Sequence, residues 1–356
     1  MRVVTIIGNR PQFVKAAAVS RRLRETHEEL IVHTGQHYDD ELSRVFFEEL
    51  GVPAPDRELG IGSGSNTDQT ARQLAALEPV LAETEPDLAL VYGDTNSTLA
   101  GAIAAAQAGI AVGHVEAGMR SYDRAMPEEL NRVLTDHVAD LLLCSTPIAI
   151  ENLEREGAVG EKYLVGDVMA DVSLAFREIA EQRSRVLDDL GLAPGEYLVV
   201  TAHRAGNVDD PARLRLLVAL LEALPDRVVF PVHPRTRTRL NDAGLAGRLA
   251  EVELIPPLGY LDFLKLARHS RAVLTDSGGV QKEAYLLGVP CVTLRDRTEW
   301  VETVDAGWNV LVDLDREAAL AALVRPLPDG ERPELYGGGH AGERVRDAVS
   351  AYTDSP

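Results

Sequence analysis

The 356-residue chain has few of the features that tie a protein to disulfides, metals or membranes. Its two cysteines, Cys144 and Cys291, lie far apart in apolar segments, so we expect both to be reduced core residues. No Cys/His spacing resembles a metal site, and no metal is predicted. No apolar run approaches the roughly 20 residues that span a bilayer, and the chain begins directly with a strand-like segment. We therefore expect a cytoplasmic protein.

Positive charge is also scarce. Lys and Arg number 36 against 56 Asp and Glu, which gives a formal net charge of -20. This balance argues against nucleic acid or an anionic membrane surface as a partner. The hydrophobic content of 45% is that of an ordinary globular protein, and the length favours two domains, each with its own core.

Segments typical of strands and helices alternate along the chain. The strands expected in the first half are 3–7, 30–34, 88–92, 110–115, 141–144 and 163–165. Those expected in the second half are 197–201, 228–232, 252–255, 272–275 and 291–294. This alternation predicts an α/β fold with two doubly wound, Rossmann-like parallel sheets. Such domains bind ligands at the carboxyl ends of their strands, here in a cleft between the two domains.

A Ser-Gly-Gly turn in the second half follows the strand 272–275. Ser277, Gly278 and Gly279 precede a helix that we expect to end at Gly288. Free amide groups at a helix N-terminus favour an anion, and glycines let a phosphate approach the backbone. A tight turn with a serine cap is an equally good interpretation of this segment alone.

Charged residues follow several of the other expected strands. In the first half, Arg10 ends a strand and Lys15 lies about a turn into the next helix, where either cation could neutralise a phosphate. Asp94 and Glu116 follow two further strands, and Glu128 opens a helix. Each acid also has a structural interpretation, as a cap or a helix-dipole partner. Carboxylates that converge on one sheet edge can act as general acids and bases.

Two histidine clusters, His203-Arg204 and His233-Pro234-Arg235, follow strands of the second half. A single histidine is more often structural than catalytic. Two such clusters beside an anion-binding turn favour a functional site.

These residues together make the chain resemble the non-hydrolysing UDP-N-acetylglucosamine 2-epimerase family over nearly its whole length. The motifs that carry the resemblance are Gly8-Asn9-Arg10-Pro11, Gly93-Asp94-Thr95, His114-Val115-Glu116-Ala117-Gly118, Pro127-Glu128-Glu129-Leu130-Asn131-Arg132, His203-Arg204, Asp276-Ser277-Gly278-Gly279 and Arg295-Asp296-Arg297-Thr298-Glu299. The resemblance implies the GT-B architecture. Its first domain would comprise residues 1–167 joined by a C-terminal helix, 341–356, and its second, UDP-binding domain residues 168–340.

The resemblance also implies an isomerase, usually a homodimer, that interconverts UDP-GlcNAc and UDP-ManNAc for surface polysaccharide synthesis. UDP would be eliminated across C1–C2 to give 2-acetamidoglucal and would then add back, without a nicotinamide or other cofactor. By motif position, Asp94, Glu116, Glu128 and His203 are the implied catalytic residues. The implied substrate-binding residues are Arg10, Lys15, Arg132, Ser277, Gly278, Gly279 and Glu283.

Two features of this chain depart from the sequence pattern of UDP-N-acetylglucosamine 2-epimerases. Gln36 and His37 match a site where many bacterial members bind a second UDP-GlcNAc as an activator, but Asp39 stands where a glutamine is expected. Other motifs also resemble the branch that acts on UDP-2,3-diacetamido-2,3-dideoxyglucuronate, whose carboxylate needs a cation such as Arg120, Arg124 or Arg297. A hydrolysing epimerase, a GT-B glycosyltransferase and a UDP-sugar sensor are more distant alternatives.

Overall fold

A computed structural model describes residues 1–35 and 54–353 of the chain. It divides into two compact units, each with its own sheet and its own cores. Unit 1 is Met1–Val172 with Glu334–Pro356, and unit 2 is Ser173–Pro333. None of the described helices is long and apolar enough to cross a membrane.

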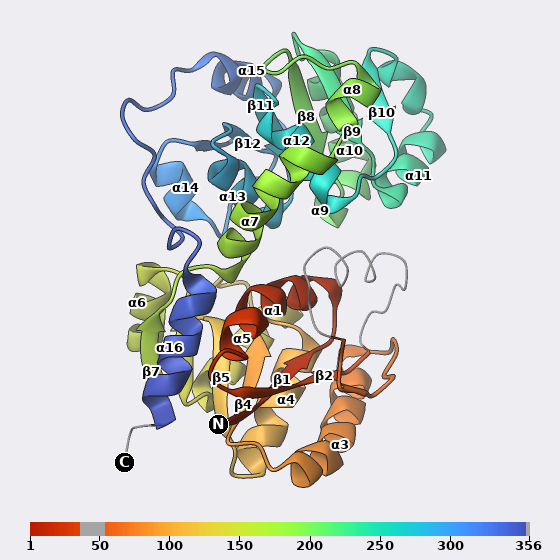
Figure 1. Cartoon of the computed structure of the whole chain (residues 1–356). Coiled ribbons are helices and arrows are strands. Elements are labelled where there is room, and N and C mark those ends of the chain that lie inside the picture. Colours follow the sequence, from red (N-terminus) through yellow and green to blue (C-terminus); the bar gives the residue numbers. More distant parts are fainter. Residues whose placement is uncertain (36–53, 354–356) are drawn as a thin grey trace. The chain divides into compact units, whose positions relative to one another are not determined.

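Unit 1 is built on a seven-stranded, fully parallel sheet (Figure 1). In spatial order its strands are β3 (Arg57–Glu58), β2 (Glu28–His33), β1 (Arg2–Ile7), β4 (Leu88–Tyr92), β5 (Ala111–Ala117), β6 (Leu141–Cys144) and β7 (Glu161–Leu164). The chain runs from β1 to β2 on one side and returns to β4 on the other. The carboxyl ends of β1 and β4 therefore form the switch point at which such sheets bind ligands.

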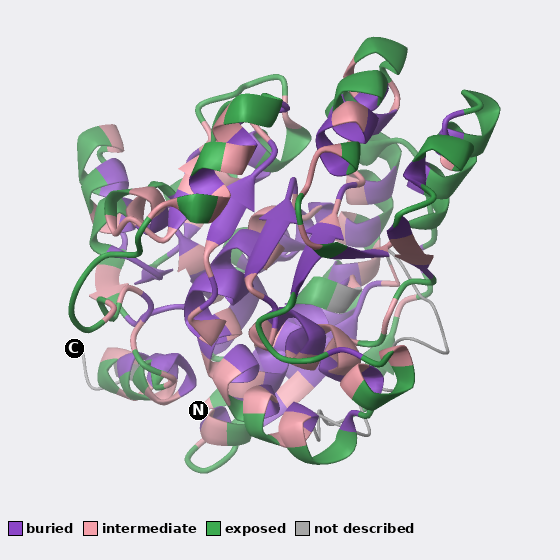
Figure 2. Cartoon of the chain, turned by 90° about the horizontal axis from the view of Figure 1, so that it is seen from above, coloured by how far each residue is buried: buried purple, intermediate pink, exposed green. Residues whose placement is uncertain are grey.

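Helices cover both faces of this sheet, because successive strand residues point to opposite sides. Val3 and Ile7 join one core with α1 (Arg10–Leu23) and the C-terminal α16 (Ala341–Thr353). Val4 and Ile6 join the other core. That second face is covered by α3 (Asn66–Thr84), α4 (Asn96–Gln107) and α6 (Pro147–Glu156). A further helix of the unit, α5 (Pro127–Val138), follows β5. Strands are mostly buried, whereas the outer sides of the helices are exposed (Figure 2).

Unit 2 repeats the plan with six parallel strands. Their order is β10 (Val252–Ile255), β9 (Arg227–Pro231), β8 (Tyr197–Thr201), β11 (Ala272–Thr275), β12 (Cys291–Thr293) and β13 (Asn309–Leu311). The helices are α7 (Val168–Arg183), which begins in unit 1, α8 (Val186–Leu190), α9 (Ala205–Val208), α10 (Pro211–Glu222), α11 (Pro234–Asp242), α12 (Tyr260–Arg268), α13 (Gly278–Leu287), α14 (Val301–Asp305) and α15 (Arg316–Val324). The switch point here lies between β8 and β11.

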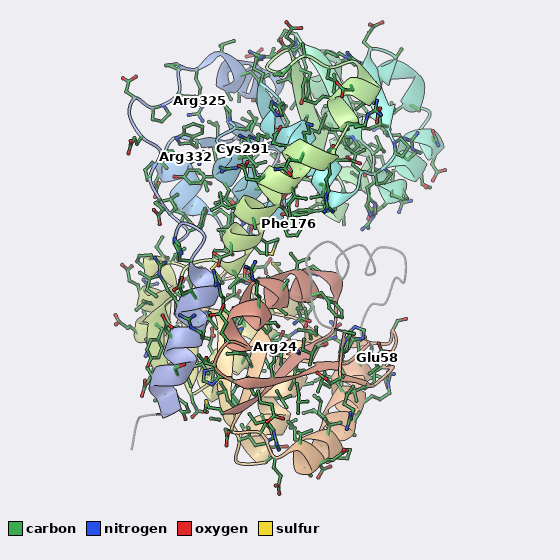
Figure 3. The ribbon with its side chains drawn as sticks, viewed as in Figure 1. Arg24, Glu58, Phe176, Cys291, Arg325 and Arg332 are labelled. Carbon is green, nitrogen blue, oxygen red and sulfur yellow. The ribbon has the colours of Figure 1, made fainter. Side chains whose placement is uncertain are left out.

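The predicted α/β fold with two parallel sheets is confirmed. Both cysteines are free and buried, as expected, and burial raises the pKa of each thiol to about 12. Cys291 is labelled in Figure 3, where it lies in unit 2. The strand β13 was not predicted, because its three residues are too few for a pattern to emerge.

Candidate active site

A buried glutamine holds together the ends of β1 and β4 in unit 1. The Gln12 side chain accepts a hydrogen bond from the Gly8 amide at 2.8 Å and donates one to the Tyr92 carbonyl at 2.7 Å. Gly8 follows β1 and Tyr92 ends β4, so one side chain fixes both sides of the switch point. Because Gln12 is buried, these hydrogen bonds are shielded from water.

Glu116 occupies a strained position near the end of β5. Its φ of 73° lies in the left-handed region, and the register with β6 shifts between Val115 and Ala117. A non-glycine residue in this conformation is uncommon and is enriched at functional sites. The bulge changes the direction in which the carboxylate points.

The Glu116 carboxylate forms an ion pair with Lys15 of α1, and both side chains are only 14% exposed. Burial favours the neutral amine, but the charges of Glu116 and Asp94 outweigh it and raise the pKa of Lys15. Lys15 therefore stays cationic beside these carboxylates.

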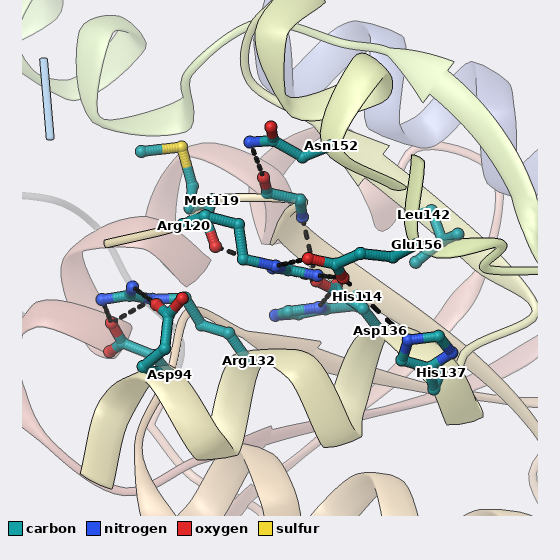
Figure 4. A network of polar contacts seen from close by, with 12 residues as sticks. Asp94, His114, Met119, Arg120, Arg132, Asp136, His137, Leu142, Asn152 and Glu156 are labelled. Atoms are coloured by element: carbon teal, nitrogen blue, oxygen red, sulfur yellow. Dashed lines mark hydrogen bonds and ion pairs between the residues drawn. The ribbon is translucent and has the colours of Figure 1, made fainter. Parts of the chain in front are cut away.

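Asp94 lies just beyond β4 and is held by Arg132 of α5 (Figure 4). The guanidinium donates from Nε and from one Nη to the same carboxylate oxygen, Oδ2, at 3.1 and 2.9 Å. Arg132 also pairs with Glu129 at 2.6 Å. The Asp94 side chain remains 34% exposed, so it can meet a ligand from solvent. The structure thus brings Lys15, Asp94, Glu116 and Arg132 into one cluster.

Glu128 differs from the other predicted acids. It is exposed on the first turn of α5, and within the described part of the chain no hydrogen bond or ion pair links it to Asp94 or Glu116. Its neighbour Glu129 is buried instead, and accepts hydrogen bonds from the Ser121 and Tyr122 amides. Arg10 is the first residue of α1, and its side chain lies outside what the structure describes.

In unit 2, a fully buried carboxylate joins the loops that follow β8 and β11. Asp276 accepts hydrogen bonds from the His203 and Arg204 amides, and from the Asn207 side chain, each at 3.1 Å. Its Oδ1 lies 3.6 Å from Nδ1 of His203. Burial lowers the pKa of His203, and the positive charges nearby act in the same direction, although the charge of Asp276 opposes them.

The Ser-Gly-Gly turn forms the start of α13. Ser277 is the N-cap by position, but its side chain makes no cap hydrogen bond, and its own amide donates to Thr275 Oγ1 at 2.9 Å. The first-turn amides of Gly278 and Gly279 have no carbonyl within the helix to bind. In the part of the chain that the structure describes, a Cβ on Gly279 would meet no other atom within 4 Å, whereas one on Gly278 would approach the Trp300 indole nitrogen. The predicted helix end at Gly288 is confirmed.

Glu283 lies one turn further along α13 and is mostly buried. The Tyr260 hydroxyl hydrogen-bonds to it, and burial together with the Glu283 charge raises the pKa of this tyrosine well above its usual value. Tyr260 also meets the Ser173 hydroxyl at 3.1 Å. Glu283 is thus a fixed carboxylate beside the proposed phosphate-binding turn.

Comparisons with known proteins match this arrangement to one family. The family model for UDP-N-acetylglucosamine 2-epimerase matches residues 21–350. The chain belongs to this family. A UDP-N-acetylglucosamine 2-epimerase homolog of Methanococcus maripaludis is 46% identical over 354 residues, covering 98% of this chain and 99% of that protein. The UDP-2,3-diacetamido-2,3-dideoxy-D-glucuronate 2-epimerase of Pseudomonas aeruginosa is also 46% identical, with the same coverage.

Among solved structures, UDP-GlcNAc 2-epimerase of Methanocaldococcus jannaschii, in complex with UDP-GlcNAc and UDP, superposes with a TM-score of 0.86. It is 40% identical to this chain, and each chain is covered completely. The GT-B architecture expected for a 2-epimerase of this family agrees with these neighbours.

Some residues predicted for this 2-epimerase family member lie outside the described part of the chain. Two residues of the site were not predicted at all. Gln36 and His37, the predicted activator site, fall within the segment 36–53, which the structure does not describe. The sequence analysis assigned no role to Gln12 or Asp276. Each of them joins, by hydrogen bonds, the ends of the two strands at a switch point or the segments that follow them. Each of them is a polar residue that closely follows a predicted strand, and this position in the sequence could have identified it.

Gly93 allows a test of how closely the acids are packed. Its φ is 64°, and an added Cβ would lie 2.9 Å from Lys15 Nζ. Gly60 has the same φ, but among the described residues no other atom lies within 4 Å of such a Cβ. We expect Gly93→Ala and Gly60→Ala to destabilise unit 1 alike, by about 1–2 kcal/mol from backbone strain. Only Gly93→Ala should lower enzymatic turnover as well, by about tenfold or more, because it displaces Lys15.

Urea unfolding and a turnover assay on both variants make this comparison. Equal turnover in the two would show that the Lys15–Glu116 contact tolerates crowding.

Proposed function

We propose that the chain is a non-hydrolysing UDP-N-acetylglucosamine 2-epimerase, an isomerase that interconverts UDP-GlcNAc and UDP-ManNAc. Family membership supports this activity, since relatives with this name match over almost their full length. The observation that carries the proposal is the pair of carboxylates at one sheet edge of unit 1. Asp94 and Glu116 are each held by a cation, Arg132 and Lys15 respectively.

The C2 proton of the sugar is not next to a carbonyl, so its removal alone would leave an unstabilised carbanion. Elimination avoids this: a carboxylate takes the C2 proton, the C1–O bond breaks, and UDP leaves with the bonding electrons. The resulting 2-acetamidoglucal regains UDP at C1 and a proton on the opposite face of C2. Epimerisation therefore needs an acid or base on each face, and we assign these roles to Asp94 and Glu116.

The cations beside these acids hold each carboxylate in place through an ion pair. Arg132 and Lys15 also compensate for the charge that moves during elimination. Glu128 is the third acid of the family pattern, and its exposed position leaves it open to a ligand. A Glu128→Gln variant tests whether it too transfers a proton or only assists binding.

We assign UDP binding to unit 2. The first-turn amides of Gly278 and Gly279 and the positive end of α13 favour a diphosphate. Asp276 holds the His203 loop beside them, and Glu283 is a fixed acceptor for the ribose hydroxyls. Arg10 is proposed to assist with the leaving diphosphate on the basis of its motif alone.

Proton NMR of the protein with UDP-GlcNAc in D2O tests the proposal. Formation of UDP-ManNAc with deuterium at C2 is the expected result. Free ManNAc with UDP would instead mean a hydrolysing enzyme. If no reaction occurs, UDP-2,3-diacetamido-2,3-dideoxyglucuronate becomes the expected substrate and is tested next. If that substrate does not react either, a glycosyltransferase or a UDP-sugar sensor is the remaining interpretation.

The uronate substrate is the second candidate because of the Pseudomonas aeruginosa relative. Its extra carboxylate needs a cation, and one of the three arginines expected for this role is already paired. Arg120 is buried in ion pairs with Asp136 and Glu156, which corrects our expectation that it was available. Arg297 contacts Asp296, and Arg124 is exposed. Arg124 and Arg297 thus remain accessible for this role.

UDP binding should change the charge of His203. Burial lowers the pKa of His203 in the free protein, so the ring is largely neutral near pH 7. A bound diphosphate stabilises the imidazolium and raises that pKa. We therefore expect proton uptake on UDP binding, largest between the free and bound pKa values.

Calorimetric titration with UDP in two buffers of different ionisation enthalpy measures this uptake. His203→Gln should abolish it. His27→Gln is the matched control, because burial also lowers the pKa of His27, which lies in unit 1. Uptake that persists in the His203→Gln protein would contradict the role of His203.

The proposal includes a homodimer, a cytoplasmic location and a role in surface polysaccharide synthesis, which rest on the family. Leu130 and Leu134, one turn apart on α5, are 50% and 41% exposed, and Leu130 lines a surface pocket of about 400 Å³. This apolar strip supports association of two copies. Light scattering of the protein and of a Leu130→Glu variant tests it, with a dimer expected only for the former.

A further inference from the structure

A buried histidine lies behind the two acids of unit 1 and contacts the loop that carries one of them. His114 is a residue of β5 with a fully buried side chain. Its Nε2 lies 2.7 Å from the carbonyl oxygen of Gly93, the residue before Asp94. Its Nδ1 lies 2.7 Å from Oδ1 of Asp136 on α5. The ring therefore connects the Asp94 loop to α5 (Figure 4).

Asp136 contacts the chain on both sides of Glu116. One carboxylate oxygen binds the His114 ring, and the other accepts the Gly118 amide at 3.1 Å. His114 and Gly118 are two residues before and two residues after Glu116. One buried carboxylate thus spans the bulge at whose apex Glu116 holds its left-handed conformation.

Asp136 is paired away from solvent, because its side chain and that of Arg120 are both fully buried. Arg120 donates to Asp136 Oδ2 at 2.7 Å and forms two hydrogen bonds with Glu156 of α6. Burial raises the pKa of Asp136, but His114 and Arg120 outweigh it and lower that pKa, so Asp136 is ionised. A fully buried charge is tolerated only when it is paired and hydrogen-bonded in this way.

The two ring contacts of His114 fix its orientation. A carbonyl oxygen can only accept, so Nε2 is the nitrogen that donates to Gly93. On the other side of the ring, Nδ1 faces Oδ1 of Asp136. The ring is thus held at both nitrogens, between the Asp94 loop and α5.

We propose that Asp136 and His114 are positioning residues for the reaction, which clamp the Glu116 bulge and the Gly93–Asp94 peptide into one catalytic arrangement. This inference rests on the proposed epimerase function, because it assigns to Asp94 and Glu116 the proton transfers at C2. Neither positioning residue needs to touch the substrate. Their effect is to keep two carboxylates from two strands in a fixed relation.

The test compares carboxylates at the two ends of β5. Asp140 accepts the Val112 amide at 2.8 Å near the start of the strand, as Asp136 accepts the Gly118 amide just beyond its end. We expect Asp136→Ala to lower kcat about 100-fold and Asp136→Asn, which keeps a polar group of the same shape, about tenfold. KM and the Kd for UDP should stay within about twofold in both, because unit 2 binds the nucleotide. Asp140→Asn should leave kcat unchanged.

A kcat for Asp136→Ala equal to that of Asp140→Asn would overturn the inference, as would a loss confined to KM. If the unaltered protein does not epimerise any UDP-sugar, the proposed function fails instead. The inference is then decided by the ¹⁵N spectrum of histidine-labelled protein. We expect the His114 ring signals of the unaltered protein to shift in Asp136→Ala and to stay unchanged in Asp140→Asn. Unchanged His114 signals in Asp136→Ala would contradict the clamp.

Discussion

Glu116→Gln is expected to lower the rate of epimerisation by about 10²- to 10⁴-fold, the usual contribution of a general acid or base. Glutamine keeps the shape of the side chain but cannot take the C2 proton. It also leaves Lys15, which is only 14% exposed, without the charge that pairs with it. The assay is conversion of UDP-GlcNAc in D2O, which reports epimerisation and deuterium incorporation together. kcat/KM should fall equally in both directions, because a substitution in the enzyme does not change the equilibrium constant of the reaction.

A matched control lies in the same sheet. Glu29 near the start of β2 is also a buried carboxylate in an ion pair, with Arg24, and accepts a hydrogen bond from the Thr5 hydroxyl. It lies away from the strand ends that carry the acids. Glu29→Gln should lower the free energy of unfolding while the folded fraction keeps its kcat. If Glu116→Gln retains the normal rate, Glu116 cannot be a proton-transfer residue.

The sequence was sufficient to locate most of the sheet. Strands 88–92, 141–144, 197–201 and 272–275 begin and end as predicted. Parallel strands are buried on both faces, so they appear as continuous apolar runs that stop at a polar or glycine residue. The position of Asp94 follows directly, because it comes just after such a run. The doubly wound order then places the ends of β1 and β4 side by side.

What the sequence could not show depends on how side chains pack. Glu128 and Glu129 are adjacent and chemically equal, yet one is exposed and the other buried beneath the 121–122 loop. Arg120 resembled a free cation, but Asp136 and Glu156 lie beside it in the folded chain. These residues are 16 and 36 positions away. A local sequence pattern cannot indicate pairs that are so far apart, whereas neighbouring residues are enough to indicate where a strand ends.

Asp276→Ala should have the largest effect on unit 2, and its cause is structural as well as functional. The side chain is fully buried and accepts the amides of His203 and Arg204 and the amide group of Asn207. Removal leaves these donors without their acceptor, and unsatisfied buried groups cost about 1–3 kcal/mol each. Some will relax toward water, so we expect unit 2 to lose roughly 2–4 kcal/mol. Urea unfolding followed by a probe in unit 2 measures this loss.

The same change should weaken UDP binding at least tenfold in the fraction that remains folded, because the His203 loop is no longer held beside the first turn of α13. Asp226→Asn is the control: Asp226 pairs with Arg271, the residue just before β11, whereas Asp276 follows the same strand. A protein with Asp226→Asn should therefore bind UDP normally. If Asp276→Ala loses stability but binds UDP as before, the loop after β8 takes no part in nucleotide binding, and the role assigned to His203 fails with it. If affinity falls while stability does not, the buried donors find other acceptors, and Asp276 serves the ligand rather than the fold.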